Sequence, residues 1–183
     1  GVYRGTGPAN RAAWLALILV AVTFAVYGQT IGFDFVGYDD KDYLTQNPRF
    51  LDGLTVEDVR WAFTSSDAAN WHPLTWMSHM LDILLFGLDP SGHHAISLLI
   101  HGLNTLLLFG ALRYMTRAVG RSAFVAALFA VHPLHAETVA WVSERKDVLS
   151  TFFAMTSMWA YAGYARRPSP GRYLASALLL ALG

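Results

Sequence analysis

Cysteine is absent from this chain of 183 residues, so it forms no disulfide and offers no thiolate ligand to a metal ion. Charge is also scarce: 14% of the residues are Asp, Glu, Lys or Arg, whereas soluble globular domains have about 25%. Hydrophobic residues make up 54% of the sequence. This composition argues against an ordinary soluble domain and favours an all-α membrane protein.

Long hydrophobic segments account for most of this composition. A helix rises about 1.5 Å per residue, so about 20 apolar residues cross a hydrocarbon core of about 30 Å. The expected spans are residues 12–31, 95–112, 122–142, 148–165 and 173–183, the last of them truncated. The first is longer than the hydrophobic region of a signal peptide, which favours an uncleaved anchor. We therefore expect the N-terminal part of a polytopic helical bundle, cut from a longer protein.

The charged residues are segregated by sign between the two sides of these spans. Eight of the thirteen Lys and Arg residues lie in three short segments that must share one side: Arg4 and Arg11; Arg113, Arg117 and Arg121; Arg166, Arg167 and Arg172. By the positive-inside tendency this side is cytoplasmic, as is the N-terminus. Ten of the thirteen acidic residues lie in the loop 32–94, which is then on the outer side.

This outer loop is too long and too aromatic for a flexible linker. The segment 55–64 begins with a Thr-x-x-Asp capping pattern, and its apolar residues fall on one helical face. The segment 74–86 also has helical spacing of its apolar residues. Both are predicted to be helices that lie along the membrane interface.

Two adjacent carboxylates, Asp39 and Asp40, follow the first span directly. Beside lipid and beside a like charge, one of them would hold its proton more tightly and could act as a general base. A solvated acidic turn, or a helix N-cap followed by Lys41 and Asp42, is the simpler explanation, and the pair alone favours it.

Ionisable residues also interrupt the third span. His132 and His135 are predicted to share a helical face near its outer end, and Pro133 loosens that turn. Imidazole and carboxylate groups, here including Glu137, can bind a divalent metal such as Zn²⁺ or Mn²⁺. On the second span, a stripe of polar residues contains His101. Such residues line a polar cavity or bond helices to one another.

Two cations lie on the outer side, where basic residues are otherwise few. Arg145 and Lys146 stand between Glu144 and Asp147 in a short predicted hairpin after the third span. Arg is suited to bidentate recognition of phosphate. Local pairing of the cations with their acidic neighbours is the simpler explanation, and it contributes little at a surface.

Longer motifs carry a family resemblance. They are YDDKDYLTQNP (38–48), GLTVEDVRWAFT (53–64), NWHPLTWMSHMLDILLFGLDPSGHH (70–94), HPLHAETVAWVSERKDVLSTFF (132–153) and RRPSPGRYL (166–174). Together they resemble bacterial membrane proteins with C-terminal tetratricopeptide (TPR) repeats, which are similar to the eukaryotic transmembrane-and-TPR O-mannosyltransferases. The resemblance covers nearly all of the chain after the first span. It implies a GT-C glycosyltransferase fold in a bacterial inner membrane, with the first loop periplasmic and the repeats downstream.

The resemblance also implies a reaction and its residues. Asp39 or Asp40, with a slight preference for Asp40, would deprotonate an acceptor hydroxyl, a Ser or Thr of a protein. That hydroxyl attacks a polyprenyl-phosphate-linked sugar, mannose, with inversion. Arg145 and Lys146 would bind the donor phosphate, with or without a metal ion. A supporting polar cavity would contain His101, His132, His135, Glu137, Glu144 and Asp147. The expected partners are the lipid-linked sugar, an acceptor protein and the bilayer, and no nucleic acid.

Three other functions are consistent with the same residues. A transporter or flippase for a lipid or polar solute would use the polar stripes as a path. A non-catalytic membrane anchor would only carry the downstream repeats, and Asp39 and Asp40 would then be dispensable. A metal protein would be built on His132 and His135. The enzyme is preferred because it explains the acidic loop and the outer cations together.

Overall fold

The computed structural model describes residues 8–47, 49, 55–66 and 71–183, and these residues form helices without any strand. The three long helices are α1 (Pro8–Tyr27), α4 (Pro90–Thr116) and α7 (Arg145–Arg166). The shorter helices are α2 (Val56–Thr64), α3 (Pro73–Phe86), α5 (Val119–Ala130), α6 (His135–Ala140) and α8 (Pro170–Ala181), with single turns η1 (Gly28–Gly32), η2 (Lys41–Thr45) and η5 (Val142–Glu144). The predicted all-α fold is confirmed.

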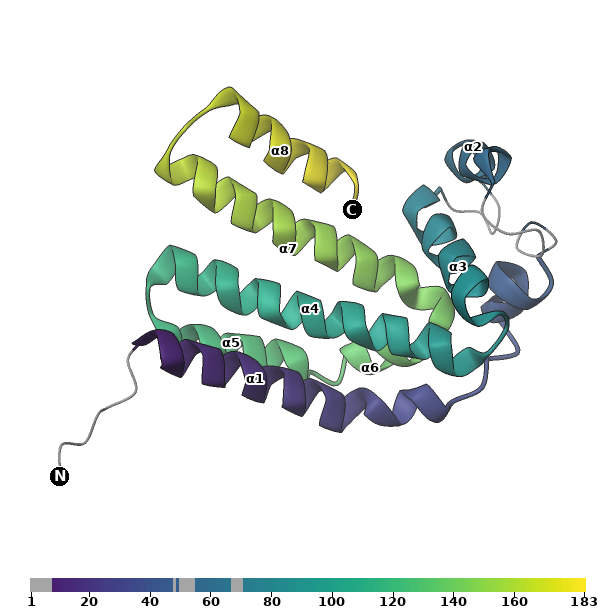
Figure 1. Ribbon diagram of the computed structural model, residues 1–183, viewed down its shortest axis with the longest axis horizontal. Helices are drawn as coiled ribbons and strands as arrows, with labels where there is room; N and C mark the ends of the chain where they lie inside the picture. The colour runs from purple at the N-terminus through teal and green to yellow at the C-terminus, as the bar shows by residue number, and fades with distance from the viewer. Residues whose placement is uncertain (1–7, 48, 50–54, 67–70) are drawn as a thin grey trace.

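Helix α4 is the centre of the bundle (Figure 1). Helices α1 and α5 pack on one side of it and α7 on the other, and α8 packs against the outer side of α7. Leu19 of α1, Phe109 of α4 and Ala126 of α5 are buried together in one apolar cluster. The polar stripe of α4 faces its neighbours, because Asn104 donates to the Val148 carbonyl at 2.9 Å and thereby bonds α4 to α7.

Two helical segments of the described chain are long and apolar enough to cross a membrane, Asn10–Gly32 and Pro90–Thr116. At about 1.5 Å per residue they extend over about 34 and 40 Å. Large apolar side chains of α1 are exposed on the bundle surface, among them Trp14, Leu17 and Ile18, as expected of a lipid-facing helix. Helix α7 contains the expected span 148–165 and is 22 residues long, but it carries more polar side chains. The chain is an all-α membrane protein.

The third span, expected at 122–142, is not one helix. Helix α5 ends at Ala130 and α6 begins at His135, because Pro133 has no backbone N–H to continue the helix. The prediction that His132 and His135 share one helical face is therefore wrong. Two carbonyl groups at this break accept bonds from other helices: Ala130 from His101 Nε2 at 3.1 Å and His132 from the Tyr27 hydroxyl at 3.0 Å.

The bundle has two chemically different ends (Figure 1). The turns between α4 and α5 and between α7 and α8 lie at the same end as the start of α1. These turns and the helix ends beside them carry Arg113, Arg117, Arg121, Arg166, Arg167 and Arg172. We call this the basic end. The opposite end, called the loop end, carries η2, α2, α3 and the start of α7. Arg4 lies outside the described residues.

The long loop folds at the loop end around a small core of its own. Thr55 and Asp58 form the predicted capping box at the start of α2, with reciprocal side-chain and backbone bonds. Tyr43, Trp76 and Met80 are buried together between η2 and α3. The two predicted loop helices are confirmed, and the loop is a packed structure that can hold a site.

Candidate functional site

Asp39 and Asp40 occupy different environments although they are adjacent. Asp40 is fully buried, and its carboxylate accepts hydrogen bonds from the Val36 N–H at 2.7 Å and from the Ser143 N–H at 3.0 Å. The Ser143 hydroxyl donates to the same carboxylate. Asp39 is half-buried, and its side chain makes no hydrogen bond or ion pair with any described residue. Asp40 therefore fixes the loop, while the carboxylate of Asp39 is available to a ligand.

The segment that was expected to form a short hairpin, 143–147, is the end of a turn followed by the beginning of a helix. Residues 142–144 form the turn η5, and Arg145 is the first residue of α7. The hairpin prediction is therefore corrected: a single 3₁₀ turn, η5, leads directly into helix α7. Successive residues of a helix point about 100° apart, so Arg145 and Lys146 have different surroundings.

The Arg145 side chain points into the protein and is fully buried. Its Nη2 donates to Asp82 Oδ2 and to the His93 carbonyl, both at 2.7 Å. Its Nε donates to Ser97 at 2.9 Å and its Nη1 to Ser78 at 2.8 Å. These bonds connect α7 with α3 and α4. The guanidinium is engaged by the protein itself, so its evident role is to hold the loop end together.

Lys146 lies instead beside a cavity of about 290 Å³ that also contacts His72, Thr75, Asp147 and Ser150. Its Nζ donates to Glu144 Oε1 at 2.8 Å and to the Ser143 carbonyl at 3.4 Å. Burial lowers the pKa of Lys146, but the hydrogen bond and charge of Glu144 outweigh it, so the net shift is upward. Lys146 is thus a cation at neutral pH.

Two neighbours complete the charge pattern of this cavity. Burial, together with the charge of Glu144, raises the pKa of Asp147. Burial, together with the charge of Lys146, lowers the pKa of His72 to about 4, so this imidazole is neutral at pH 7. His72 stacks on Tyr43, with ring centroids 5.4 Å apart. The cavity therefore presents the Lys146 cation and the Asp147 carboxyl group beside the neutral imidazole of His72.

Ser143 joins the acidic pair to this cavity. Its N–H and hydroxyl bond to Asp40, and its carbonyl accepts from Lys146. Tyr43, three residues after Asp40, also lies under Lys146, with Nζ 5.6 Å from the ring centroid. Through Ser143 the structure thus connects Asp40 of the acidic motif with Lys146, which in turn pairs with Glu144.

The predicted histidine residues form a separate group. The rings of His101 and His135 are 5.3 Å apart, and those of His132 and His135 are 6.2 Å apart. His132 and Glu137 are exposed. Among the described residues, no group of three or more potential metal ligands includes His132 or His135. His101 bonds α4 to the end of α5 through the Ala130 carbonyl, whereas His132 Nδ1 accepts from the Leu134 N–H within the break.

Sequence reasoning missed His79 and Asp82. They lie one turn apart on α3, and both are buried against His93 of α4. The signal was present, because a His-x-x-Asp pair on a predicted helix places both side chains on one face. His93, the third residue of the group, and Arg145, which contacts Asp82, come from other parts of the chain. No local sequence pattern therefore indicates them.

Comparison with known proteins identifies similar sequences. The chain is 31% identical to protein O-mannosyl-transferase TMTC1 of Mus musculus over 169 residues, covering 86% of this chain and 17% of the relative. It is 30% identical to TMTC4 of Homo sapiens, covering 81% and 23%, and 32% identical to Tmtc1 of Drosophila melanogaster, covering 80% and 17%.

This chain spans about a fifth of the length of those curated relatives. No family model matches the sequence, and no solved structure matches it. The similarity extends over most of the chain, so it includes much of the bundle described above.

Proposed function

We propose that this chain is part of a membrane glycosyltransferase that transfers mannose from a polyprenyl-phosphate carrier to a Ser or Thr hydroxyl of a protein. The observation that carries the proposal is the contact between the acidic motif and Lys146 through Ser143. A general base and a phosphate-binding cation at one site are what such a transfer requires. The relatives named protein O-mannosyl-transferases support the same reaction class.

Asp39 is the proposed general base. Its carboxylate is half-buried and engages no described residue, so it can accept a proton from the acceptor hydroxyl. The hydroxyl oxygen then forms a bond to the anomeric carbon, while the bond from that carbon to the carrier phosphate oxygen breaks. Attack from the face opposite the phosphate inverts the configuration. Asp40 acts as a positioning residue, since its oxygens are already occupied by Val36 and Ser143.

Lys146 is the proposed partner of the departing phosphate. Its ammonium lies at the N-terminus of α7, where the helix dipole also favours an anion. A phosphate would compete with Glu144 for Lys146, and the half-buried position of the pair strengthens either interaction. Arg145 supports this arrangement from the interior, because its bonds hold the first turn of α7 against α3 and α4.

The proposed orientation places the loop end on the non-cytoplasmic side of the membrane. The basic end carries seven arginines of the described segments, the six named above and Arg11 at the start of α1. By the positive-inside tendency this end belongs on the cytoplasmic side. The resemblance to bacterial proteins with TPR repeats supports an inner membrane and a periplasmic site. In this arrangement the carrier lipid would remain in the bilayer while its phosphate reaches Lys146.

The test uses the full-length protein in membranes with radiolabelled polyprenyl-phosphate mannose. We expect label transfer to protein by the wild type and a loss of about 100-fold or more in Asp39→Asn, the scale typical for a general base. Asp34→Asn, which alters an exposed carboxylate of the same loop, is the matched control and retains transfer. Folded, inserted protein that transfers no label would favour the anchor or the transporter instead.

A further inference from the structure

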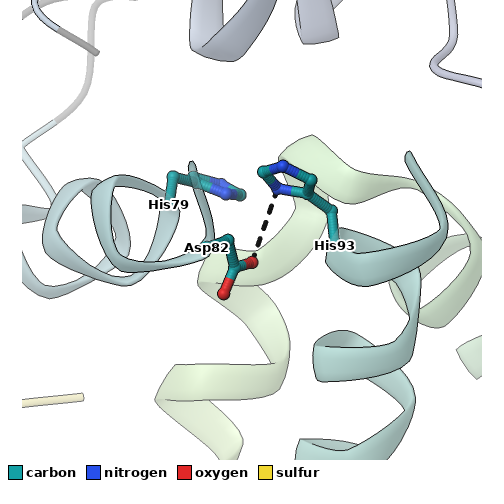
Figure 2. A group of neighbouring side chains, drawn as sticks. All are labelled: His79, Asp82 and His93. Atoms are coloured by element: carbon teal, nitrogen blue, oxygen red, sulfur yellow. Dashed lines mark ion pairs between the residues drawn. The ribbon is translucent and has the colours of Figure 1, made fainter. Parts of the chain in front are cut away.

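His79, Asp82 and His93 meet in the interior of the loop end, where α3 contacts α4 (Figure 2). The side chains of Asp82 and His93 are 3% and 0% exposed, and His79 is fully buried. One potential ligand atom of each lies within 4.8 Å of the other two. In the part of the chain that the structure describes, no other group of three such side chains is as close.

The hydrogen bond of His93 defines which of its nitrogens carries a proton. Its Nε2 lies 3.0 Å from the Gly87 carbonyl, which can only accept, so Nε2 donates. A neutral imidazole then has its lone pair on Nδ1. This Nδ1 lies 3.5 Å from Asp82 Oδ2, another lone-pair atom. The two atoms repel each other unless a proton or a metal ion lies between them.

The surroundings of His79 indicate that a metal ion, rather than a proton, lies between His93 and Asp82. In the described structure neither of its ring nitrogens has a hydrogen-bond partner, although the side chain is fully buried. An unpaired buried polar group costs about 1–3 kcal/mol, so such a group calls for a missing partner. A proton on His93 would satisfy Asp82 but leave His79 unpaired. Figure 2 shows both imidazole rings beside the Asp82 carboxylate, so one cation can contact all three.

The groups around these three residues resemble the surroundings of protein metal ligands. A ligating histidine usually donates its second N–H to a carbonyl, as His93 does to Gly87, and a ligating carboxylate is itself hydrogen-bonded. Arg145 provides that bond, since its Nη2 lies 2.7 Å from Asp82 Oδ2.

We infer that His79, Asp82 and His93 bind a zinc ion that fastens the loop helix α3 to α4. Two imidazoles and one carboxylate suit Zn²⁺, whereas Mg²⁺ and Ca²⁺ prefer oxygen ligands alone. Three protein ligands leave one coordination position for water. Because both helices are joined at the ion, its role is structural, and the inference does not depend on the proposed mannosyl transfer.

The test measures zinc in the full-length protein, purified without a polyhistidine tag, loaded with ZnCl₂ and dialysed extensively. We expect stoichiometric zinc in the wild type by elemental mass spectrometry, and background levels in His79→Gln and His93→Gln. His94→Gln is the matched control, because His94 is equally buried and adjacent but lies outside the group. Zinc should raise the unfolding temperature of the wild type and of His94→Gln only.

A second measurement covers the case in which the ligand variants fail to fold. X-ray absorption at the zinc edge of the wild-type protein should show two imidazole ligands and otherwise oxygen. The inference is overturned if the loaded wild type retains no zinc. It is also overturned if His94→Gln loses the metal along with the other variants, or if the absorption spectrum lacks imidazole.

Discussion

Asp40 and Ser143 are 103 residues apart in the sequence, and both the N–H and the hydroxyl of Ser143 donate to the Asp40 carboxylate. This contact attaches the start of the long loop to the turn before α7. It also distinguishes Asp40 from Asp39. The Asp40 carboxylate holds the loop in place, whereas the Asp39 carboxylate has no comparable bonds among the described residues.

Asp40→Asn is predicted to destabilise the protein by about 1–3 kcal/mol, the cost of an unsatisfied buried group. The amide offers one acceptor oxygen, so its NH₂ must face either the Val36 N–H or the Ser143 donors. Asp39→Asn removes no such bond and should leave stability unchanged while transfer is lost. Thermal unfolding of the purified full-length variants checks this. Equal unfolding temperatures for both variants would contradict the division of roles.

Arg145→Met is predicted to destabilise the protein by about 3–5 kcal/mol, because it removes the cation that pairs with the buried Asp82 carboxylate. The adjacent Lys146→Met should cost about 1 kcal/mol or less, since the pair with Glu144 is partly exposed. Its effect should fall on mannosyl transfer, with a loss of about 100-fold. Yield and unfolding temperature are measured for both variants. A well-folded, inactive Arg145→Met protein would instead place Arg145 at the donor phosphate.

Gly92→Ala is predicted to destabilise the start of α4 by about 1–3 kcal/mol through overpacking. A Cβ atom at this position would lie 2.3 Å from Cγ and 2.7 Å from Cβ of Phe86. Gly102→Ala on the same helix is the control, because its added methyl would meet Phe24 at an ordinary 3.5 Å. Chemical denaturation should separate the two variants. If both unfold at the same denaturant concentration, α3 does not pack against α4 at Phe86 as described.

Stability is predicted to fall as the pH falls from about 6.5 to about 4, in part through His72. Burial lowers the pKa of His72 to about 4 in the folded protein, so in this window the unfolded chain binds the additional proton. His72→Gln should make the pH dependence shallower. His132→Gln, which replaces an exposed histidine, is the control. Unfolding temperatures at pH 7.5 and pH 5 measure the difference, and an unchanged slope in His72→Gln would refute the assignment.

Local sequence patterns were sufficient for most helices. The Thr55 capping box, the apolar spacing of 74–86 and the long apolar runs each depend on residues within one or two turns of each other. The structure also keeps the charges segregated, because the arginines in and beside the two helix–helix turns lie at the basic end. Such features need no knowledge of what each helix packs against.

The roles of adjacent residues could not be predicted in the same way. Arg145 and Lys146 are both basic and neighbouring, yet one meets Asp82, 63 residues away, and the other lies beside the cavity. The sequence likewise favours Asp40 over Asp39 as the base only slightly, whereas the structure buries Asp40 and leaves Asp39 half-buried. These distinctions depend on which side of a short turn faces the interior, and long-range packing determines that.

The break between α5 and α6 has a consequence for the lipid around the protein. Helix α5 is 12 residues long, about 18 Å, and stops short of a hydrocarbon core of about 30 Å. In lipid, backbone carbonyls released at such a break would find no hydrogen-bond donor. Tyr27 of α1 and His101 of α4 provide those donors. They satisfy carbonyl groups that water would satisfy at a protein surface. Loss of these two donor side chains is therefore expected to impair insertion of the protein into the membrane, before any substrate binds.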